Sequence, residues 1–313
     1  MSKFLQMLER EGPVILDGGL ATQLEAMGHD IGGVLWSAAL LASDPRSIVD
    51  AHLAYLEAGA ACIISASYQA SREGFLSKGH SAADADSLIV SAVELALAAR
   101  DEYLAANSTQ KPVLVAASVG PFGAAMHDGS EYTGFYDVSD EHLHQFHAER
   151  LALLDDAGAD VLAVETIPNQ REAVILRELL AGCSTPAWVS FACRDGDSLS
   201  DGTSLHDAVA IYADHPTVHA LGINCTPPQF VSSLIGEIRS AAPGSAIVVY
   251  PNSGETYDSR DNSWSGEACD LDHDFDVTAW YAAGAKLIGG CCRTGPDDIA
   301  RIRERLAQAS GPG

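Results

Sequence analysis

The chain has 313 residues, 47% of them hydrophobic and 19% charged, which is the composition of a globular protein and excludes an intrinsically disordered one. Its formal net charge of −25 disfavours nucleic acid and anionic membrane surfaces as partners. The sequence has no apolar run near the roughly 20 residues that a membrane helix needs and no signal-peptide pattern at its start, so we expect a cytoplasmic protein.

Apolar, β-rich runs recur along the chain and predict eight strands. Most are continuously apolar rather than alternating, which is typical of strands buried on both faces of a parallel sheet. Helical patterns separate most of them, for example over residues 82–104 and 140–154. In chain order the runs are Val14 to Gly18, Cys62 to Tyr68, Val113 to Val119, Val161 to Ile167, Trp188 to Cys193, Val218 to Cys225, Ala246 to Asn252 and Leu287 to Cys291.

Three of these strands follow a helix through the same short motif. Each motif contains Ala-Gly-Ala, with Gly59, Gly158 and Gly284 at the centre. A glycine just past a helix end supplies the left-handed cap that stops the helix. These segments are therefore predicted helix–strand units.

The repeated strand–helix pattern predicts a (β/α)8 barrel of the TIM type. No linker or composition shift divides the chain, so we expect one barrel domain over residues 1–313. An open doubly wound sheet is the alternative, and it is disfavoured because no Gly-x-Gly-x-x-Gly turn follows the first strand. Residues 253–274, rich in Asp, Ser, Glu and Gly, are predicted to form a long loop after the seventh strand.

Polar residues gather at the C-terminal ends of the predicted strands, where the active sites of such barrels lie. Asp17 ends the first run, and Glu165 lies near the end of the fourth. Cys225 ends the sixth, and the adjacent Cys291 and Cys292 end the eighth. Carboxylates and thiols are therefore expected together at one rim of the barrel.

The three thiols are candidate ligands of a catalytic Zn²⁺, which binds thiolates tetrahedrally and keeps one position open for substrate. Cys291 and Cys292 can share a metal only where the backbone leaves extended geometry, which Gly289 and Gly290 permit. Buried apolar thiols or a vicinal disulfide are the alternatives on spacing alone. Three thiolates leave the metal centre with a formal negative charge, which suits activation of a further thiol as a nucleophile.

The two acids have two candidate roles. They could act as a general acid and base, or they could bind a substrate ammonium group through charge-assisted hydrogen bonds. The amides of Gly18 and Gly19 could approach a carboxylate closely, because no side chains stand in the way. Together these groups predict a site for an amino acid that carries a thiol. A turn role for Asp17 and a salt bridge in the barrel mouth for Glu165 are the alternatives.

At these residues the sequence resembles the homocysteine S-methyltransferase family, and within it the S-methylmethionine-using branch. The resemblance covers residues 13–301. It implies a (β/α)8 barrel with Zn²⁺ on Cys225, Cys291 and Cys292. We expect no cobalamin, because the chain is short and shows no separate cobalamin or folate module. The motifs that carry the resemblance include DGGLATQLE (17–25), SASYQAS (65–71), SVGPFGA (118–124), GSEYTG (129–134), ETIPN (165–169), LSDGT (199–203), GINC (222–225), YPNSGE (250–255) and GGCCRTGPDDI (289–299).

The resemblance also implies where the substrates bind. A sulfonium or quaternary ammonium group binds favourably to the face of an aromatic ring, so aromatic side chains are suitable contacts for a cationic methyl donor. Relatives often have Thr at the position of Ser65. The implied residues are Asp17 and Glu165 for the homocysteine ammonium, Gly18, Gly19 and Ser65 for its carboxylate, Trp36 and Tyr68 for the methyl donor, and Asn224 and Asn252 as groups that position their neighbours.

We therefore expect a zinc-dependent S-methyltransferase that acts on small molecules and moves a methyl group onto homocysteine, making methionine. The resemblance favours S-methylmethionine as donor, then S-adenosylmethionine, then betaine. A metal-dependent hydrolase on the same barrel is one alternative, disfavoured because none of the eleven histidines lies at a predicted strand end. A non-catalytic thiolate zinc or redox protein is another, and it gives the motifs at 65–71 and 250–255 no role.

The run HLHQFH at residues 142–147 has the composition of a metal cluster. Its pattern places it in the middle of a helix, where His142 and His144 do not share a face, so we expect a solvated helix surface. The remaining cysteines match no ligand position and are expected to pack in the interior or lie at the surface. They are Cys62, Cys183, Cys193 and Cys269.

Overall fold

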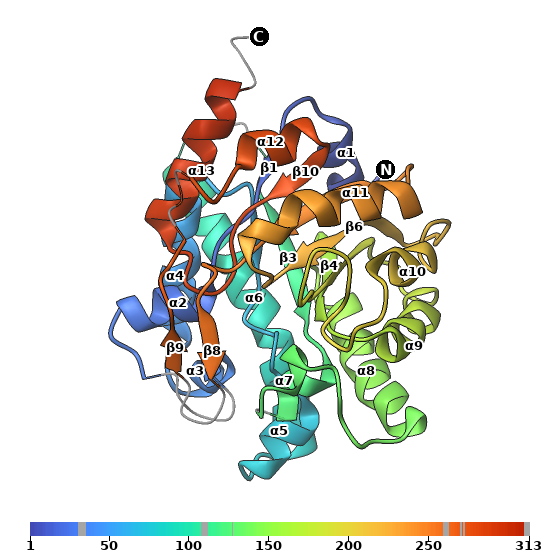
Figure 1. Ribbon diagram of the computed structural model, residues 1–313. Coiled ribbons are helices and arrows are strands. Elements are labelled where there is room, and N and C mark those ends of the chain that lie inside the picture. Colours follow the sequence, from blue (N-terminus) through green and yellow to red (C-terminus); the bar gives the residue numbers. More distant parts are fainter. Residues whose placement is uncertain are drawn as a thin grey trace.

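Parallel strands joined edge to edge form the centre of the protein. The structure is a computed structural model that describes residues 1–30, 36–107, 112–126, 128–258, 263–269, 271 and 273–309. Eight strands form one sheet in the order β1-β10-β7-β6-β5-β4-β3-β2 (Figure 1). A parallel bridge between Leu16 and Cys62 joins the two ends of this order, so the sheet closes. The predicted (β/α)8 barrel is confirmed, and the open doubly wound sheet was the wrong alternative.

Each barrel strand overlaps one of the eight predicted runs, and most are shorter; β5 and β10 begin before their predicted runs, and β10 shares only Leu287 and Ile288 with its run. Every residue of β3, β4 and β5 is buried, as expected for strands between a filled barrel interior and surrounding helices. The strands are β1 (Val14–Ile15), β2 (Cys62–Ile64), β3 (Leu114–Val119), β4 (Val161–Ile167), β5 (Ala187–Phe191), β6 (Val218–Asn224), β7 (Ala246–Tyr250) and β10 (Ala285–Ile288).

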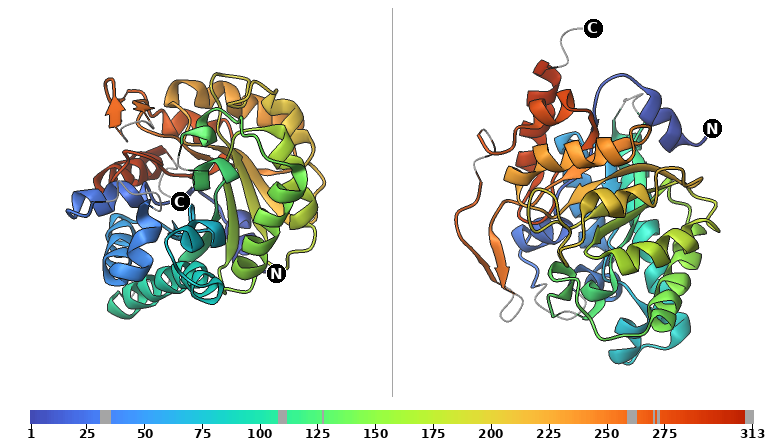
Figure 2. Two further views of the ribbon diagram at one scale, coloured as in Figure 1. Left: turned by 90° about the horizontal axis from the view of Figure 1, so that it is seen from below. Right: turned by 45° about the vertical axis from the view of Figure 1, so that its right-hand side comes forward.

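Helices surround the strands, as both views in Figure 2 show. No helix in the described part of the chain is both long and apolar enough to cross a membrane. The α-helices are α1 (Lys3–Glu9), α2 (Leu20–Ala26), α3 (Leu40–Ser43), α4 (Pro45–Ala58), α5 (Arg72–Ser77), α6 (Ala82–Ala106), α7 (Phe122–Met126), α8 (Asp140–Asp155), α9 (Gln170–Leu180), α10 (Leu205–Ala210), α11 (Val231–Ala241), α12 (Val277–Ala282) and α13 (Pro296–Ala309). Short 3-10 helices are η1 (Trp36–Ala39), η2 (Ser130–Tyr132) and η3 (Pro228–Phe230).

The three Ala-Gly-Ala motifs form the predicted helix–strand junctions. Gly59, Gly158 and Gly284 have φ angles of 106°, 86° and 107°. Only a residue without a Cβ adopts these angles at little cost, and the left-handed turn stops the helix before the chain enters the barrel. The motifs therefore help to set where β2, β4 and β10 begin.

Apolar side chains close one end of the barrel. Leu16, Leu114 and Trp188 are among the residues that fill the interior. Phe4 of α1 packs against the Trp188 ring with the two centroids 6.0 Å apart. Because this plug blocks the N-terminal end, ligands can enter the barrel mouth only from the C-terminal rim, where the predicted site residues lie.

The segment after β7 is not a plain loop, which corrects the prediction for residues 253–274. Strands β8 (Thr256–Asp258) and β9 (Ser263–Ser265) pair in antiparallel fashion and form a small hairpin that projects from the barrel (Figure 1). The sequence carries Thr256, Tyr257 and Trp264, residue types that favour strands. The surrounding Asp, Ser and Gly residues obscured this short signal.

Candidate active site

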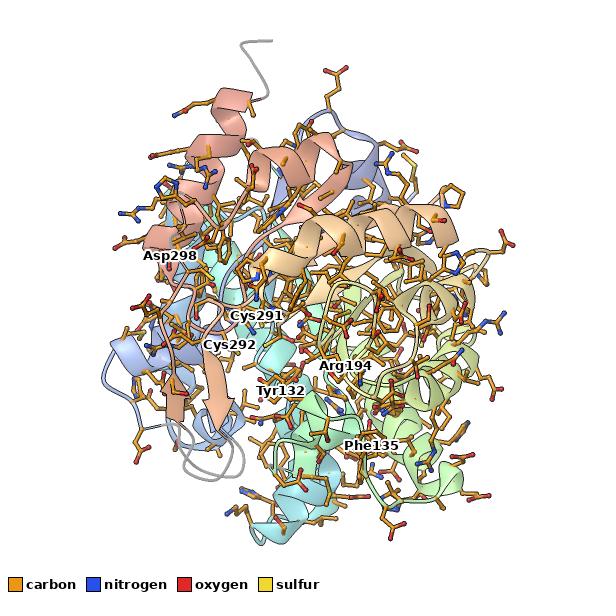
Figure 3. The ribbon with its side chains drawn as sticks, in the orientation of Figure 1. Tyr132, Phe135, Arg194, Cys291, Cys292 and Asp298 are labelled. Carbon is orange, nitrogen blue, oxygen red and sulfur yellow. The ribbon has the colours of Figure 1, made fainter. Side chains whose placement is uncertain are left out.

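The cysteines from the ends of β6 and β10 meet at the C-terminal rim. The Sγ atoms of Cys225, Cys291 and Cys292 lie within 4.8 Å of one another, and those of Cys225 and Cys292 are 3.5 Å apart. Cys291 and Cys292 are labelled in Figure 3, on the segment that follows β10. In the described part of the chain no other group of His, Cys, Asp or Glu gathers closely enough to hold a metal ion. All seven cysteines are free thiols.

The backbone leaves extended geometry where it presents these sulfurs. Strand β10 ends at Ile288, before both adjacent cysteines. Cys225 has a φ of 48°, in the left-handed region that side-chain-bearing residues rarely adopt. Asn252 Nδ2 donates to the Cys225 carbonyl at 3.1 Å and stabilises this turn. Gly290 permits close packing instead of a left-handed turn, because a Cβ there would lie 2.2 Å from Cγ2 of Thr294.

The thiol cluster favours a bound cation. The pKa of Cys225 is lowered, chiefly by the hydrogen bond between its sulfur and that of Cys291 and then by the one with Cys292. The pKa values of Cys291 and Cys292 are raised, chiefly through their hydrogen bonds to Cys225. One thiolate therefore forms readily, and the next two form only against mutual repulsion. A metal ion among the three sulfurs would remove that repulsion, so the donor set fits a metal that prefers thiolates.

Asp17 and Glu165 are both buried at the barrel mouth, with 1% and 6% of their surfaces exposed. Asp17 Oδ2 accepts a hydrogen bond from the Ile64 amide at 2.7 Å, whereas Asp17 Oδ1 has no hydrogen-bond partner among the described residues. Glu165 accepts hydrogen bonds from the hydroxyl of Ser118 and, at 3.0 Å, from that of Tyr250. Burial raises the pKa of Glu165 to about 7, and burial and then the charge of Glu165 raise that of Asp17. A cationic ligand group would stabilise both carboxylates.

Glu165 lines a cavity at the barrel mouth together with the predicted residues Gly18, Gly19 and Ser65, whereas Asp17 lies next to this lining and is not part of it. The Gly19 amide already donates to the Thr294 carbonyl at 3.0 Å. The Ser65 hydroxyl pairs with that of Ser67 at 2.8 Å and accepts from the Ser118 amide at 3.1 Å. The protein therefore already uses two of these three polar groups to fix the rim.

Asn224 lines the cavity, and both ends of its side-chain amide are hydrogen-bonded within the protein. Its Oδ1 accepts from the Thr166 amide at 2.7 Å and from the Ser190 hydroxyl at 2.8 Å. Its Nδ2 donates to Thr166 Oγ1 at 2.7 Å. These bonds hold Thr166 at a φ of 62°, directly after Glu165. Through these bonds Asn224 positions Thr166, and with it the neighbouring Glu165.

Tyr68 and Trp36 are the two residues predicted to contact the methyl donor, and the structure describes the side chain of Tyr68 alone. Tyr68 lines the cavity and is half-buried. Burial, and then the charge of Glu131, raise the pKa of its phenol, which therefore stays neutral. Trp36 begins η1, but its side chain lies outside the described residues.

Glu131 and Tyr132 of η2 also line this cavity, and the sequence analysis did not assign them. The Tyr132 hydroxyl lies 3.7 Å from Cys225 Sγ, and Figure 3 shows Tyr132 close to the two labelled cysteines. Glu131 is 4% exposed, and its Oε2 has no hydrogen-bond partner. Burial raises its pKa to about 7. The GSEYTG motif was the available signal, but its polar residues follow no predicted strand end.

The cavity as a whole is acidic and aromatic. None of its described lining residues is Lys, Arg or His. Such a lining favours a ligand that brings its own positive charge. The groups that give it this character are Glu131 and Glu165, Tyr68, Tyr132 and Tyr250, and the three clustered cysteines.

Comparison with known proteins places this site in a family. Residues 14–306 match the family model described as homocysteine S-methyltransferase. The chain belongs to the homocysteine S-methyltransferase family. It is 47% identical over 302 residues to the homocysteine S-methyltransferase of Escherichia coli (strain K12), covering 96% of this chain and 97% of that protein. It is 44% identical over 306 residues to homocysteine S-methyltransferase YbgG of Bacillus subtilis (strain 168), with 96% and 97% covered.

A solved structure agrees with this homocysteine S-methyltransferase fold. The crystal structure of the homocysteine methyltransferase MmuM from Escherichia coli in its metallated form matches with a TM-score of 0.85 and 45% identity, covering 96% of this chain and 98% of that one. The protein is therefore a methyltransferase.

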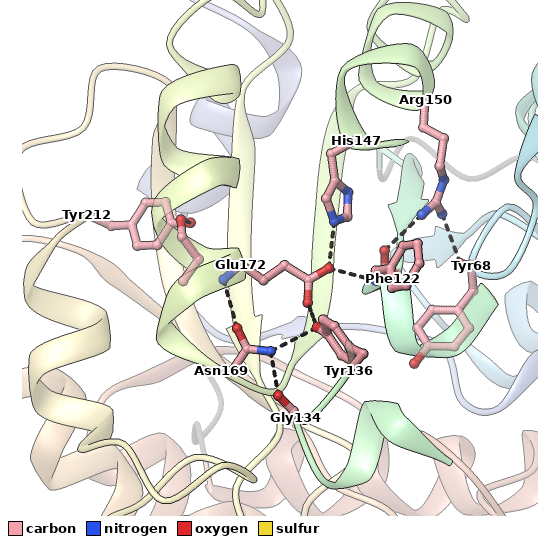
Figure 4. Close-up of polar contacts among 11 residues, drawn as sticks. Tyr68, Phe122, Gly134, Tyr136, His147, Arg150, Asn169, Glu172 and Tyr212 are labelled. Atoms are coloured by element: carbon pink, nitrogen blue, oxygen red, sulfur yellow. Dashed lines mark hydrogen bonds and ion pairs between the residues drawn. The ribbon is translucent and has the colours of Figure 1, made fainter. Parts of the chain in front are cut away.

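In this homocysteine S-methyltransferase a buried polar network anchors the loop that carries Glu131 and Tyr132 (Figure 4). Glu172 of α9 accepts hydrogen bonds from the Phe122 amide at 2.7 Å and from the Tyr136 hydroxyl, one at each end of this loop. It also pairs with His147 Nε2 of α8 at 2.6 Å. The loop is thus fixed to two helices outside the barrel.

The buried His147 corrects the prediction of a solvated surface for residues 142–147. His142 and His144 are exposed, but Leu143, Phe146 and His147 are buried. They belong to one stripe that faces the protein interior and continues to Arg150. The sequence pattern does not indicate this stripe, because two of its members, His147 and Arg150, are polar. Their hydrogen-bond partners are Glu172 and the Gly120 carbonyl, which only the tertiary structure brings near them.

Glu172→Gln is expected to weaken this anchor. A neutral amide places an N–H₂ group where the carboxylate accepts from three donors, so we expect a loss of about 1–3 kcal/mol in the free energy of unfolding. Michaelis constants for both substrates should rise, because the loop borders the cavity that both would share. Urea unfolding and steady-state kinetics measure these effects. Glu178→Gln, on the exposed side of the same helix, is the matched control, and equal behaviour of the two variants would refute the anchoring role.

Proposed function

We propose that this methyltransferase moves a methyl group from S-methylmethionine to the sulfur of L-homocysteine, giving two molecules of methionine, with Zn²⁺ as cofactor. The observation that carries the proposal is the convergence of three cysteine sulfurs at the mouth of an acidic cavity. S-adenosylmethionine is the second candidate donor. We further propose that residues 1–313 form one homocysteine-binding barrel domain.

Cys225, Cys291 and Cys292 would hold the Zn²⁺. A free thiol has a pKa of about 8.5 and is mostly protonated at neutral pH. When bound, this ion would hold a substrate thiol in its deprotonated, nucleophilic form at that pH. A donor set of three sulfurs leaves one tetrahedral position for the substrate. The remaining work of binding and orienting the two substrates falls to side chains of the cavity.

Asp17 and Glu165 are proposed to bind the homocysteine ammonium group. Support comes from their burial, from the raised pKa of each carboxyl, and from Asp17 Oδ1, which has no hydrogen-bond partner among the described residues. A bound cation would stabilise the charged form of both carboxylates. Ser118 and Tyr250 fix the Glu165 carboxylate in place. The Gly18 and Gly19 amides with Ser65 remain the proposed carboxylate site; the existing bonds of Gly19 and Ser65 make Gly18 its main donor.

Tyr68, with Trp36, is proposed to face the methyl donor, and Tyr132 borders the same space. The homocysteine sulfur attacks the methyl carbon, the bond from that carbon to the donor sulfur breaks, and its electron pair stays on the donor. The sulfonium becomes a neutral thioether, and the thiol proton leaves to solvent. Aromatic faces bind the cationic donor, and a cavity of low polarity favours the loss of its charge.

Isotope transfer tests the proposal. The protein is given homocysteine and a CD₃-labelled donor, either S-methylmethionine, S-adenosylmethionine or betaine, with and without a zinc chelator. We expect labelled methionine from S-methylmethionine, its loss on chelation, and its return with added Zn²⁺. Label from a different donor alone would overturn the donor assignment, and full activity in metal-free protein would overturn the cofactor. No label from any donor in zinc-loaded protein would overturn the reaction.

A further inference from the structure

Glu131 is a buried carboxylate with no ion-pair partner among the residues that the structure describes. It lies in η2, is 4% exposed, and lines the cavity. Among the described residues none donates a hydrogen bond to its Oε2, and none of those that line the cavity is Lys, Arg or His. A buried charge without a partner costs free energy, so a protein retains one where a ligand completes it.

The surroundings of Glu131 differ from those of the pair proposed for the homocysteine ammonium. Asp17 follows β1 and bonds to the Ile64 amide, whereas Glu165 lies within β4 and bonds to Ser118 and Tyr250. Glu131 comes instead from the loop after β3, and its charge acts on the Tyr68 phenol and on Cys225. The next residue, Tyr132, reaches Cys225 Sγ at 3.7 Å. The cavity therefore has a second acidic position, on the side of Tyr68 and Tyr132.

We propose that the Glu131 carboxylate pairs with a cationic group of the methyl donor and makes the enzyme selective for positively charged donors. The inference rests on the proposed function and adds the residue that recognises the second substrate. S-methylmethionine carries two cations, a sulfonium and an ammonium, and both suit a buried carboxylate beside aromatic rings.

The identity of the paired cation has a kinetic consequence. The ammonium keeps its charge through methyl transfer, so a carboxylate bound to it stabilises ground state and transition state alike and lowers only the donor KM. The sulfonium loses its charge, so a carboxylate bound there stabilises the ground state more. In either case Glu131→Gln should raise the donor KM without a matching fall in kcat. A purely structural role would instead change kcat and the KM values of both substrates.

The experiment compares wild type, Glu131→Gln and Glu178→Gln in the zinc-loaded enzyme. We expect Glu131→Gln to raise the KM for S-methylmethionine about 10- to 100-fold, the range for loss of a charge-assisted hydrogen bond, and to leave the homocysteine KM nearly unchanged. The des-amino analogue of S-methylmethionine locates the contact. If Glu131→Gln raises the KM for this analogue by the same factor as the KM for S-methylmethionine, the sulfonium is the partner of Glu131. If the substitution leaves the KM for the analogue unchanged, the ammonium is the partner.

Two measurements keep folding and turnover separate from recognition. The melting temperature of Glu131→Gln should equal or exceed that of wild type, because the variant removes a buried charge that has no ion-pair partner among the described residues, whereas Glu172→Gln should melt lower. Calorimetric titration with S-methylmethionine reports donor binding without turnover. Donor binding that weakens only in Glu131→Gln would support the inference even if no donor gave methionine. An unchanged donor affinity, or an equal loss for homocysteine, would overturn it.

Discussion

Cys225→Ser is expected to strip the protein of zinc and to lower methyl transfer by more than about 100-fold. Altering only the groups that support metal ligands already lowers metal affinity or activity about 10- to 100-fold, so loss of a ligand itself should cost more. Serine keeps the size of the side chain but replaces a thiolate by a hydroxyl that zinc binds poorly. It also leaves Cys291 and Cys292 as a vicinal pair without the third sulfur that now lies 3.5 Å from Cys292 Sγ.

Zinc content by plasma mass spectrometry and the CD₃-transfer assay measure the result. Cys183→Ser is the matched control, because Cys183 is half-buried, its thiol donates to the Leu179 carbonyl, and it lies outside the cluster. A melting temperature of the Cys225 variant close to that of metal-free wild type would show that the fold persists. Full zinc and full activity in Cys225→Ser would refute the ligand assignment.

The barrel was predictable because its strands are buried on both sides. Runs such as Val161 to Ile167 have no polar face, and few structures other than a covered parallel sheet bury such runs. The glycines of the three Ala-Gly-Ala motifs mark the helix ends independently of the apolar pattern. The hairpin of β8 and β9 was not predictable in this way, because strands of three residues carry little periodicity.

The site was predictable only where it follows strand ends. The sequence indicates that Cys225 and Cys291 share a rim, because the parallel order of a barrel dictates it. It does not indicate Glu131, which reaches the cavity from a loop. That loop depends on Glu172, a residue of a helix on the outside of the barrel. It also does not reveal the left-handed φ of Cys225, which a hydrogen bond from Asn252 stabilises.

Glu165→Gln is expected to raise the KM for homocysteine about 10- to 100-fold, because it removes one charge-assisted partner of the substrate ammonium. Glutamine keeps the shape of the side chain and can still meet Ser118 and Tyr250, so the barrel mouth should remain folded. The KM for S-methylmethionine should change less, since the donor is proposed to meet Tyr68 and Glu131. Steady-state kinetics with each substrate varied in turn provide the measurement, with Glu178→Gln as the matched control.

The pH dependence of the same constant tests the charge of Glu165 directly. Burial raises its pKa to about 7, so in the empty enzyme the carboxyl is increasingly protonated, and unable to pair with an ammonium, as the pH falls through 7. The homocysteine KM of wild type should therefore rise toward low pH. Proton release from the substrate thiol changes the homocysteine KM with pH to a similar extent in wild type and in Glu165→Gln. The difference between the two pH profiles of this KM therefore reports the titration of the Glu165 carboxyl. Parallel pH profiles and equal KM values would show that Glu165 does not bind the ammonium group.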